Sequence, residues 1–125
     1  MMSNIDYSLF GQCSLQNKTE SDRYVYEQLS KVFTGMSGRY TRLRIIKQLT
    51  DSFENVNSLS KILDLDYKTV KRNIKILEKH NMIVPFGEKY GTMYYLSPFL
   101  EKNICILYEI IKKTEKKFNR KKNYI

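Results

Sequence analysis

The chain has 125 residues, 42% of them hydrophobic, so it is long enough to bury one core and too short for several domains. Lys and Arg number 22 against 13 Asp and Glu, which gives a formal net charge of +9. The excess is uneven, because residues 1–38 carry three basic and four acidic side chains and residues 39–125 carry 19 and nine. A basic balance favours polyanionic partners through long-range attraction and counterion release.

Composition also argues against several classes of protein. No stretch approaches the roughly 18 consecutive apolar residues of a membrane span. The N-terminus lacks the basic region and apolar run of a signal peptide. Two cysteines, Cys13 and Cys105, are too few for a disulfide framework and fit a reducing compartment. We therefore expect a cytoplasmic protein without a membrane partner. A redox switch through Cys105 stays an alternative to the usual role of a free cysteine as a small buried hydrophobe.

The first half of the chain is predicted to be helical after an N-terminal arm. The arm, residues 1–20, has no sustained hydrophobic period. Apolar residues then recur every three or four positions over residues 21–33 and again over residues 39–49, which predicts two amphipathic helices. Gly35 and Gly38 lie between the two segments and predict a hinge-like loop.

The next segment predicts two further helices and a β-hairpin. Residues 54–56 are expected to be a loop or a very short strand. A short helix then begins near Ser58, and a longer one begins after Asp66, a residue type favoured at helix N-caps. Asn81 ends it. Two short apolar or aromatic runs follow, separated by a glycine-flanked loop of five residues, a pattern typical of a hairpin.

This order of elements is that of a winged helix-turn-helix, and the spacing of three residues supports it. Such a motif needs a small residue where its helices touch, then one that tolerates left-handed backbone, then a β-branched core residue. Ser60, Asp64 and Val70 stand at those places. Asp visits the left-handed region more readily than most residues, although glycine would suit the turn better. We therefore predict a mainly α fold with a small β-hairpin, in which residues 21–97 form the winged helix-turn-helix domain.

The helix after the turn divides into an apolar and a basic face. At about 100° per residue, its three aliphatic residues fall within roughly 60°, opposite an arc of Lys and Arg. A recognition helix needs this division, with one face in the core and the other presenting groups to phosphates and base edges. The simpler alternative is a solvated basic face. The candidate DNA-binding residues of this helix are Tyr67, Lys68, Thr69, Lys71, Arg72, Asn73, Lys75 and Lys79.

The hairpin loop is the predicted wing. Lys89 and Tyr90 stand at its tip, where they would reach an adjacent DNA backbone or minor groove. Glu88 works against such a contact. An ordinary turn with one exposed lysine is the equally simple alternative.

The C-terminal segment, residues 98–125, is predicted to be one long helix followed by a basic tail. Ser97 and Pro98 suit its N-cap and first position, and the helix should extend to about residue 118. Its apolar residues recur at spacings of three and four, as in a heptad seam. This pattern favours self-association, although the helix could instead pack on its own domain. The candidate dimerisation residues are Leu100, Ile104, Leu107, Ile111 and Phe118.

The chain resembles the ArsR-type winged helix-turn-helix regulators, especially those common in archaea. The resemblance rests on Arg-Leu-Arg-Ile-Ile at residues 42–46, Asn-Ser-Leu-Ser at 57–60, the run from 65 to 77 that contains Leu-Asp-Tyr-Lys-Thr-Val, and Tyr-Gly-Thr-Met-Tyr-Tyr-Leu-Ser at 90–97. It implies that residues 67–75 read the major groove and that the first and last helices support a homodimer. Members that sense metals have a cysteine pair before the turn, where this chain has Leu63 and Asp64, or Asp and His ligands on the last helix, which here has no histidine. A metal-sensing role therefore does not carry over.

The sequence gives no sign of catalysis or of a bound cofactor. His80 is the only histidine, so the usual zinc sites would need carboxylates and the two distant cysteines. No phosphate-binding Gly-rich loop or nucleophile elbow is present. We expect a homodimeric transcription regulator that binds double-stranded DNA sequence-specifically and is not an enzyme. The alternatives are a winged-helix module that binds protein and an adaptor that binds nucleic acid without sequence preference.

Overall fold

The structure is a computed structural model that describes residues 20–34, 37–87 and 91–122, with side chains described as far as residue 114. The described elements are α1 (Glu20–Phe33), α2 (Arg39–Asp51), α3 (Val56–Leu63), α4 (Tyr67–Lys79), β1 (Ile83–Phe86), β2 (Met93–Leu96), α5 (Pro98–Lys102) and α6 (Ile104–Lys122). The expected fold class, mainly α with a small β-hairpin, is confirmed.

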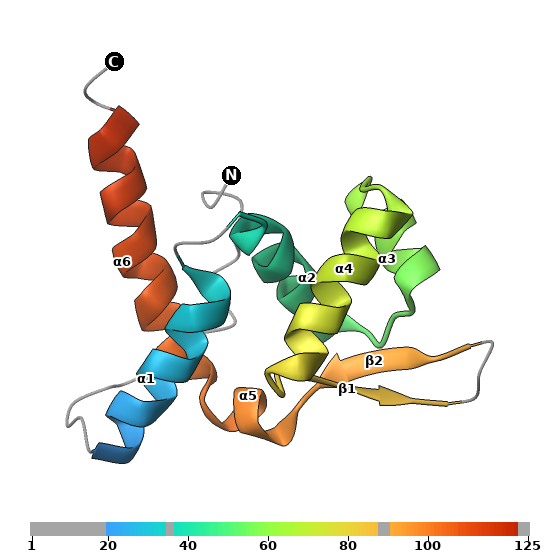
Figure 1. The fold of residues 1–125 in the computed structure, drawn as a ribbon, viewed down its shortest axis with the longest axis horizontal. Coiled ribbons are helices and arrows are strands. Elements are labelled where there is room, and N and C mark those ends of the chain that lie inside the picture. The colour runs from blue at the N-terminus through green and yellow to red at the C-terminus, as the bar shows by residue number, and fades with distance from the viewer. Residues whose placement is uncertain (1–19, 35–36, 88–90, 123–125) are drawn as a thin grey trace.

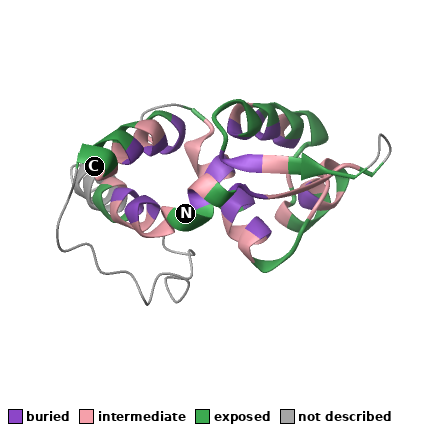
Figure 2. Ribbon diagram, turned by 90° about the horizontal axis from the view of Figure 1, so that it is seen from below, coloured by how far each residue is buried: buried purple, intermediate pink, exposed green. Residues whose placement is uncertain are grey.

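The helices form two groups that share one core (Figure 1). α1 and α6 pack side by side at one end, and α2, α3 and α4 gather at the other end beside the hairpin. α2 contacts α1, α3, α4 and β2, so it joins the two groups. Figure 2 shows the buried positions on the inward faces of these elements and the exposed positions on their outer faces.

The helix-turn-helix forms through local interactions that the sequence signals. Asn55 caps α3, because its side-chain oxygen accepts from the Ser58 amide at 2.7 Å while the Ser58 hydroxyl accepts from the Asn55 amide at 3.0 Å. Asp64 ends α3 in the left-handed region, with φ 53°, as the motif spacing predicts. The Ser60 carbonyl then accepts from the Leu65 amide at 2.9 Å, which closes the turn into α4.

The hairpin pairs β1 with β2 in an antiparallel register that sets Ile83 opposite Leu96 and Phe86 opposite Met93. A third segment joins its edge, because the Tyr94 amide donates to the Glu54 carbonyl at 2.9 Å. Residues 54–56, expected to be a loop or a very short strand, thus contribute a single bridge. This bridge ties the hairpin to the start of α3.

The single C-terminal helix expected from the sequence is broken at Asn103. The Ser97 hydroxyl accepts from the Leu100 amide at 3.0 Å and caps α5, with Pro98 in the first turn as predicted. Asn103 ends α5, because its side-chain amide donates to the Phe99 carbonyl at 2.8 Å. Its own carbonyl accepts from the Ile106 amide at 3.0 Å, where α6 begins. Asn favours such local bonds over helix continuation, which explains the break.

The predicted dimer seam is mostly part of the chain's own core, which corrects the sequence-based assignment. Leu100, Leu107 and Ile111 are at most 3% exposed. Leu107 and Ile111 lie on α6, which packs against α1, whereas Leu100 lies on the short helix α5. All three belong to the core cluster, so their side chains cannot also reach a partner. Ile104 is half-buried and keeps part of its surface, whereas the side chain of Phe118 lies outside the described residues.

Among the described residues, no helix combines the length and apolar character needed to cross a bilayer.

Candidate nucleic-acid interface

α4 presents the basic face that its sequence predicts. Val70, Ile74 and Leu77 are at most 1% exposed and anchor the helix in the core. The five basic side chains on the opposite side are all exposed, and Tyr67, at the first position of the helix, is 48% exposed. These five are Lys68, Lys71, Arg72, Lys75 and Lys79. Asp66 occupies the N-cap position as predicted, although its side chain makes no capping hydrogen bond.

Asn73, a candidate DNA-contacting residue, lies in the core instead. Its side chain is 1% exposed, and its amide nitrogen donates to the Thr69 carbonyl at 2.8 Å. The helical period explains this position, because Asn73 lies within about 60° of both Val70 and Leu77 on the wheel and about 100° from Arg72. We therefore remove Asn73 from the candidate contact set. Thr69 is half-buried at the edge of the basic face.

The partner of Asn73 is Arg42 on α2, a residue for which the sequence alone predicts no role in binding. The guanidinium Nη1 donates to Asn73 Oδ1 at 2.8 Å, and Nε donates to the Val32 carbonyl at 2.7 Å near the end of α1. Arg42 is 1% exposed, and burial lowers its pKa below the usual value for arginine. Its Nη2 has no hydrogen-bond partner within the described part of the chain. One guanidinium thus joins α1 and α2 to α4.

Gly38 is required where the chain passes this guanidinium. Its φ is 86°, a left-handed value that suits glycine. A Cβ at this position would lie 3.0 Å from both Arg42 Nη1 and Asn73 Oδ1. The backbone can therefore approach the Arg42–Asn73 pair only without a side chain. The sequence does carry a signal for Arg42. On the helical wheel of α2 this residue falls between Ile46 and Leu49, within the apolar stripe, where a charged residue is unusual.

A groove of about 420 Å³ lies between α4 and the hairpin. Lys71 and Lys75 line it from α4, together with the start of α3 and part of β2. The Tyr94 side chain lines the groove as well, and burial raises the pKa of its phenol, with smaller contributions from Glu78 and Tyr67. Two lysines against the single carboxylate of Glu78 give the described lining a positive balance, which suits an anion. The predicted wing-tip residues, Lys89 and Tyr90, lie outside the described residues.

The opposite face of the hairpin carries an aromatic cluster. The ring centroid of Phe53 lies 5.4 Å from that of Phe86 and 5.9 Å from that of Tyr95, and the latter two rings are 5.3 Å apart. Phe53 and Phe86 are 58% and 40% exposed. The cluster joins the α2–α3 loop to the hairpin and leaves apolar surface open to solvent.

The sequence favours a free thiol at Cys105, whereas in the structure this cysteine is disulfide-bonded. The described residues contain no free cysteine. His, Cys, Asp and Glu side chains of the described residues do not form any group of three or more suited to a metal ion.

Comparison with known proteins identifies the fold. No protein-family model and no curated protein sequence matches the chain. Solved structures do match. Reduced HlyU from Vibrio cholerae is 23% identical and aligns over 70% of this chain and 88% of its own, with a TM-score of 0.57. The transcriptional regulator HlyU from Vibrio vulnificus is 18% identical over 74% of this chain and 92% of its own, with a TM-score of 0.58.

A third match is a homodimeric winged helix-turn-helix DNA-binding domain, Mb0332 from Mycobacterium bovis, described as a possible ArsR-family transcriptional regulator. It is 13% identical and aligns over 79% of this chain and 91% of its own, with a TM-score of 0.56. At these identities the likeness concerns the fold, and it agrees with the helix order, the left-handed Asp64 turn and the hairpin described above. The chain therefore has the winged helix-turn-helix fold of ArsR-like transcription regulators.

Proposed function

We propose that this protein is a cytoplasmic transcription regulator that binds double-stranded DNA sequence-specifically by inserting α4 into the major groove. The observation that carries the proposal is the division of α4 into a buried apolar face and an exposed face with five basic side chains. A helix anchored in this way can enter a groove about 12 Å wide without losing its position in the core. The similar structures described as transcriptional regulators support the same function.

The residues of α4 are expected to divide between bases and phosphates by their distance from its N-terminus. Tyr67, Lys68 and Arg72 lie in the first half, which in helix-turn-helix proteins contacts base edges. Lys79 ends the helix and should reach only phosphate. Lys71 and Lys75 face the groove toward the hairpin, where a backbone phosphate would sit between two ammonium groups.

A comparison of three alanine variants tests this division. Arg72→Ala removes a potential bidentate guanine contact, so it should cost about 1–3 kcal/mol and relax preference at one position per half-site. Lys79→Ala should weaken binding to cognate and random DNA alike. It should also reduce the slope of log affinity against log salt concentration by about one unit. Lys31→Ala removes the same charge from an exposed position on α1 and serves as the control. Equal affinity of the unmodified protein for cognate and scrambled DNA would refute sequence-specific recognition. The protein would then be an adaptor that binds nucleic acid without sequence preference.

We also propose that the regulator is a homodimer, as Mb0332 is described to be. Because the seam is largely internal, we expect α6 to contact the partner through the part that remains accessible, which includes the half-buried Ile104 and Tyr108. Two-fold symmetry then requires a roughly palindromic DNA site with half-sites about 10–10.5 base pairs apart, or a multiple of that spacing. Selection of bound fragments from genomic DNA measures this spacing directly.

The aromatic cluster on the hairpin favours a second candidate, a winged-helix module that binds protein. Phe53 and Phe86 expose apolar area that a DNA-binding surface does not need. Binding through this cluster would change little with salt, in contrast to DNA binding. Replacing both phenylalanines with serine should leave DNA affinity unchanged if the two surfaces act separately.

A further inference from the structure

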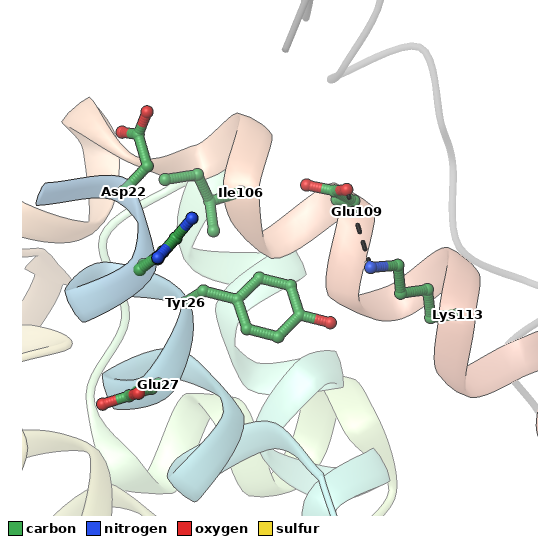
Figure 3. Close-up of a pocket in the computed structure, with 7 residues that line it drawn as sticks. Asp22, Tyr26, Glu27, Ile106, Glu109 and Lys113 are labelled. Carbon is green, nitrogen blue, oxygen red and sulfur yellow. Dashed lines mark ion pairs between the residues drawn. The ribbon is translucent and has the colours of Figure 1, made fainter. Parts of the chain in front are cut away.

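A second site of opposite charge preference lies between α1 and α6, away from α4. It is a cavity of about 330 Å³, within the size range of small-molecule pockets. Figure 3 shows its side chains converging from the two helices, with the Tyr26 ring at the centre. Its lining residues are Asp22, Arg23, Tyr26 and Glu27 of α1 and Ile106, Glu109 and Lys113 of α6.

The chain's own lysine shows which ligand chemistry this cavity accepts. The Lys113 ammonium lies 5.1 Å from the centroid of the Tyr26 ring, a cation–π distance, and 3.7 Å from Glu109 Oε1. The ring face and a carboxylate thus already hold a cation together. The Lys113 side chain is 53% exposed, so a competing cation can displace it into solvent.

The rest of the lining sets the charge and the shape of the ligand. Three carboxylates, those of Asp22, Glu27 and Glu109, face two basic groups here, although the chain as a whole carries +9. Ile106 and the Tyr26 ring supply apolar surface beside these charges. An anion would meet an excess of negative charge, whereas a cation with an apolar body would satisfy both kinds of lining.

We propose that the cavity between α1 and α6 binds an organic cation, a protonated or quaternary amine that carries an apolar group. The ammonium lies over the Tyr26 ring beside Glu109 in place of the Lys113 ammonium, and the apolar group contacts Ile106.

The residues of α6 proposed for self-association differ from those that line the cavity. At about 100° per residue, Ile104 and Tyr108 project roughly 140° away from Glu109 and Lys113 around the helix axis. The accessible residues proposed for the dimer and the cavity residues therefore occupy different flanks of α6.

Titration of the full chain with benzyltrimethylammonium, followed by calorimetry and by NMR of the Tyr26 and Ile106 signals, tests the proposal. We expect saturable binding that shifts these signals, and no binding of p-toluenesulfonate, an anion of similar size. Tyr26→Leu should weaken binding by about two- to thirty-fold, the range of one cation–π interaction. Tyr24→Leu, which changes an exposed tyrosine of the same helix, should leave the affinity unchanged.

The sharpest test is a gain of affinity. Lys113→Gln removes the internal competitor and should tighten binding several-fold, whereas Lys112→Gln removes the same charge from the neighbouring position, over the Tyr108 ring, and should not. Glu109→Gln keeps the shape of the cavity and should weaken binding, so the test stands even if Tyr26→Leu does not fold. Equal binding of the sulfonate, or a Lys113→Gln variant that binds no tighter than Lys112→Gln, would overturn the proposal.

Discussion

The hydrogen bond between Arg42 and Asn73 should couple the stability of α2 and α4, and a double-mutant cycle measures that coupling. The cycle uses Arg42→Met, Asn73→Leu and the double variant, because both substitutions keep the approximate volume of the side chain. Neither side chain reaches solvent, so each single variant leaves a buried partner without its hydrogen bond. In the double variant both polar groups are absent.

The magnitude follows from the groups left unpaired. Arg42→Met breaks the bonds to Asn73 Oδ1 at 2.8 Å and to the Val32 carbonyl at 2.7 Å, each involving a charged donor. Such bonds contribute about 1.5–3 kcal/mol, and an orphaned buried acceptor costs about 1–3 kcal/mol. Burial of a guanidinium whose Nη2 has no described partner offsets part of this loss. We expect Arg42→Met to reduce the free energy of unfolding by about 2–4 kcal/mol, and a coupling energy of about 1–3 kcal/mol.

Urea denaturation of the four proteins at one pH gives these values. Arg42→Lys should not restore stability, because one ammonium lacks the fork geometry that reaches the Val32 carbonyl and Asn73 Oδ1 together. Free energies of unfolding that add within about 0.5 kcal/mol would show that the pair contributes no specific interaction, and the account of how α4 is held would then fail.

Three further predictions concern the dimer, the groove and the turn. Leu107→Asp should unfold the chain, because this side chain is 1% exposed, whereas Ile104→Asp should leave a folded monomer by circular dichroism and sedimentation. Burial raises the pKa of Tyr94, so the folded state favours the protonated phenol. The contribution of this phenol to the free energy of unfolding is complete below about pH 10 and is lost as the pH rises through the folded-state pKa. Urea midpoints at rising pH should fall less for Tyr94→Phe. Asp64→Gly should raise the free energy of unfolding by about 0.5–1 kcal/mol, because a left-handed φ of 53° is unfavourable for a residue with a Cβ. An unchanged midpoint of thermal unfolding would exclude backbone strain at this position.

Short-range patterns predicted the fold well because their physical causes are local. The left-handed Asp64, the N-cap at Ser97 and the hairpin all depend on residues within a few positions of each other. The amphipathic split of α4 is likewise a property of one helix. Each of these features can therefore be inferred before any tertiary contact is known.

Long-range contacts could not be predicted from the sequence, because periodicity does not identify the partner of an apolar face. The stripe that includes Leu107 is the same whether α6 packs on α1 or on a second copy, and the structure shows that α1 covers it. A polar residue such as Asn73 is expected on the exposed side, although its position on the wheel places it in the core. Only the fold shows that Arg42, 31 positions away, supplies its hydrogen bond.

α1 connects the two sites that the structure suggests, so we expect binding at one to affect the other. Tyr26 lines the cavity in the middle of this helix, and the Val32 carbonyl near its end accepts the Arg42 hydrogen bond that leads to Asn73 of α4. We expect a shift of α1 to change this hydrogen bond and thereby the position of α4. Benzyltrimethylammonium should therefore change DNA affinity, and saturating DNA should change the affinity for the cation by the same factor. The linkage should disappear in Arg42→Met if that variant stays folded. Linkage that persists in this variant would place the coupling in the packing of α1 on α2 instead.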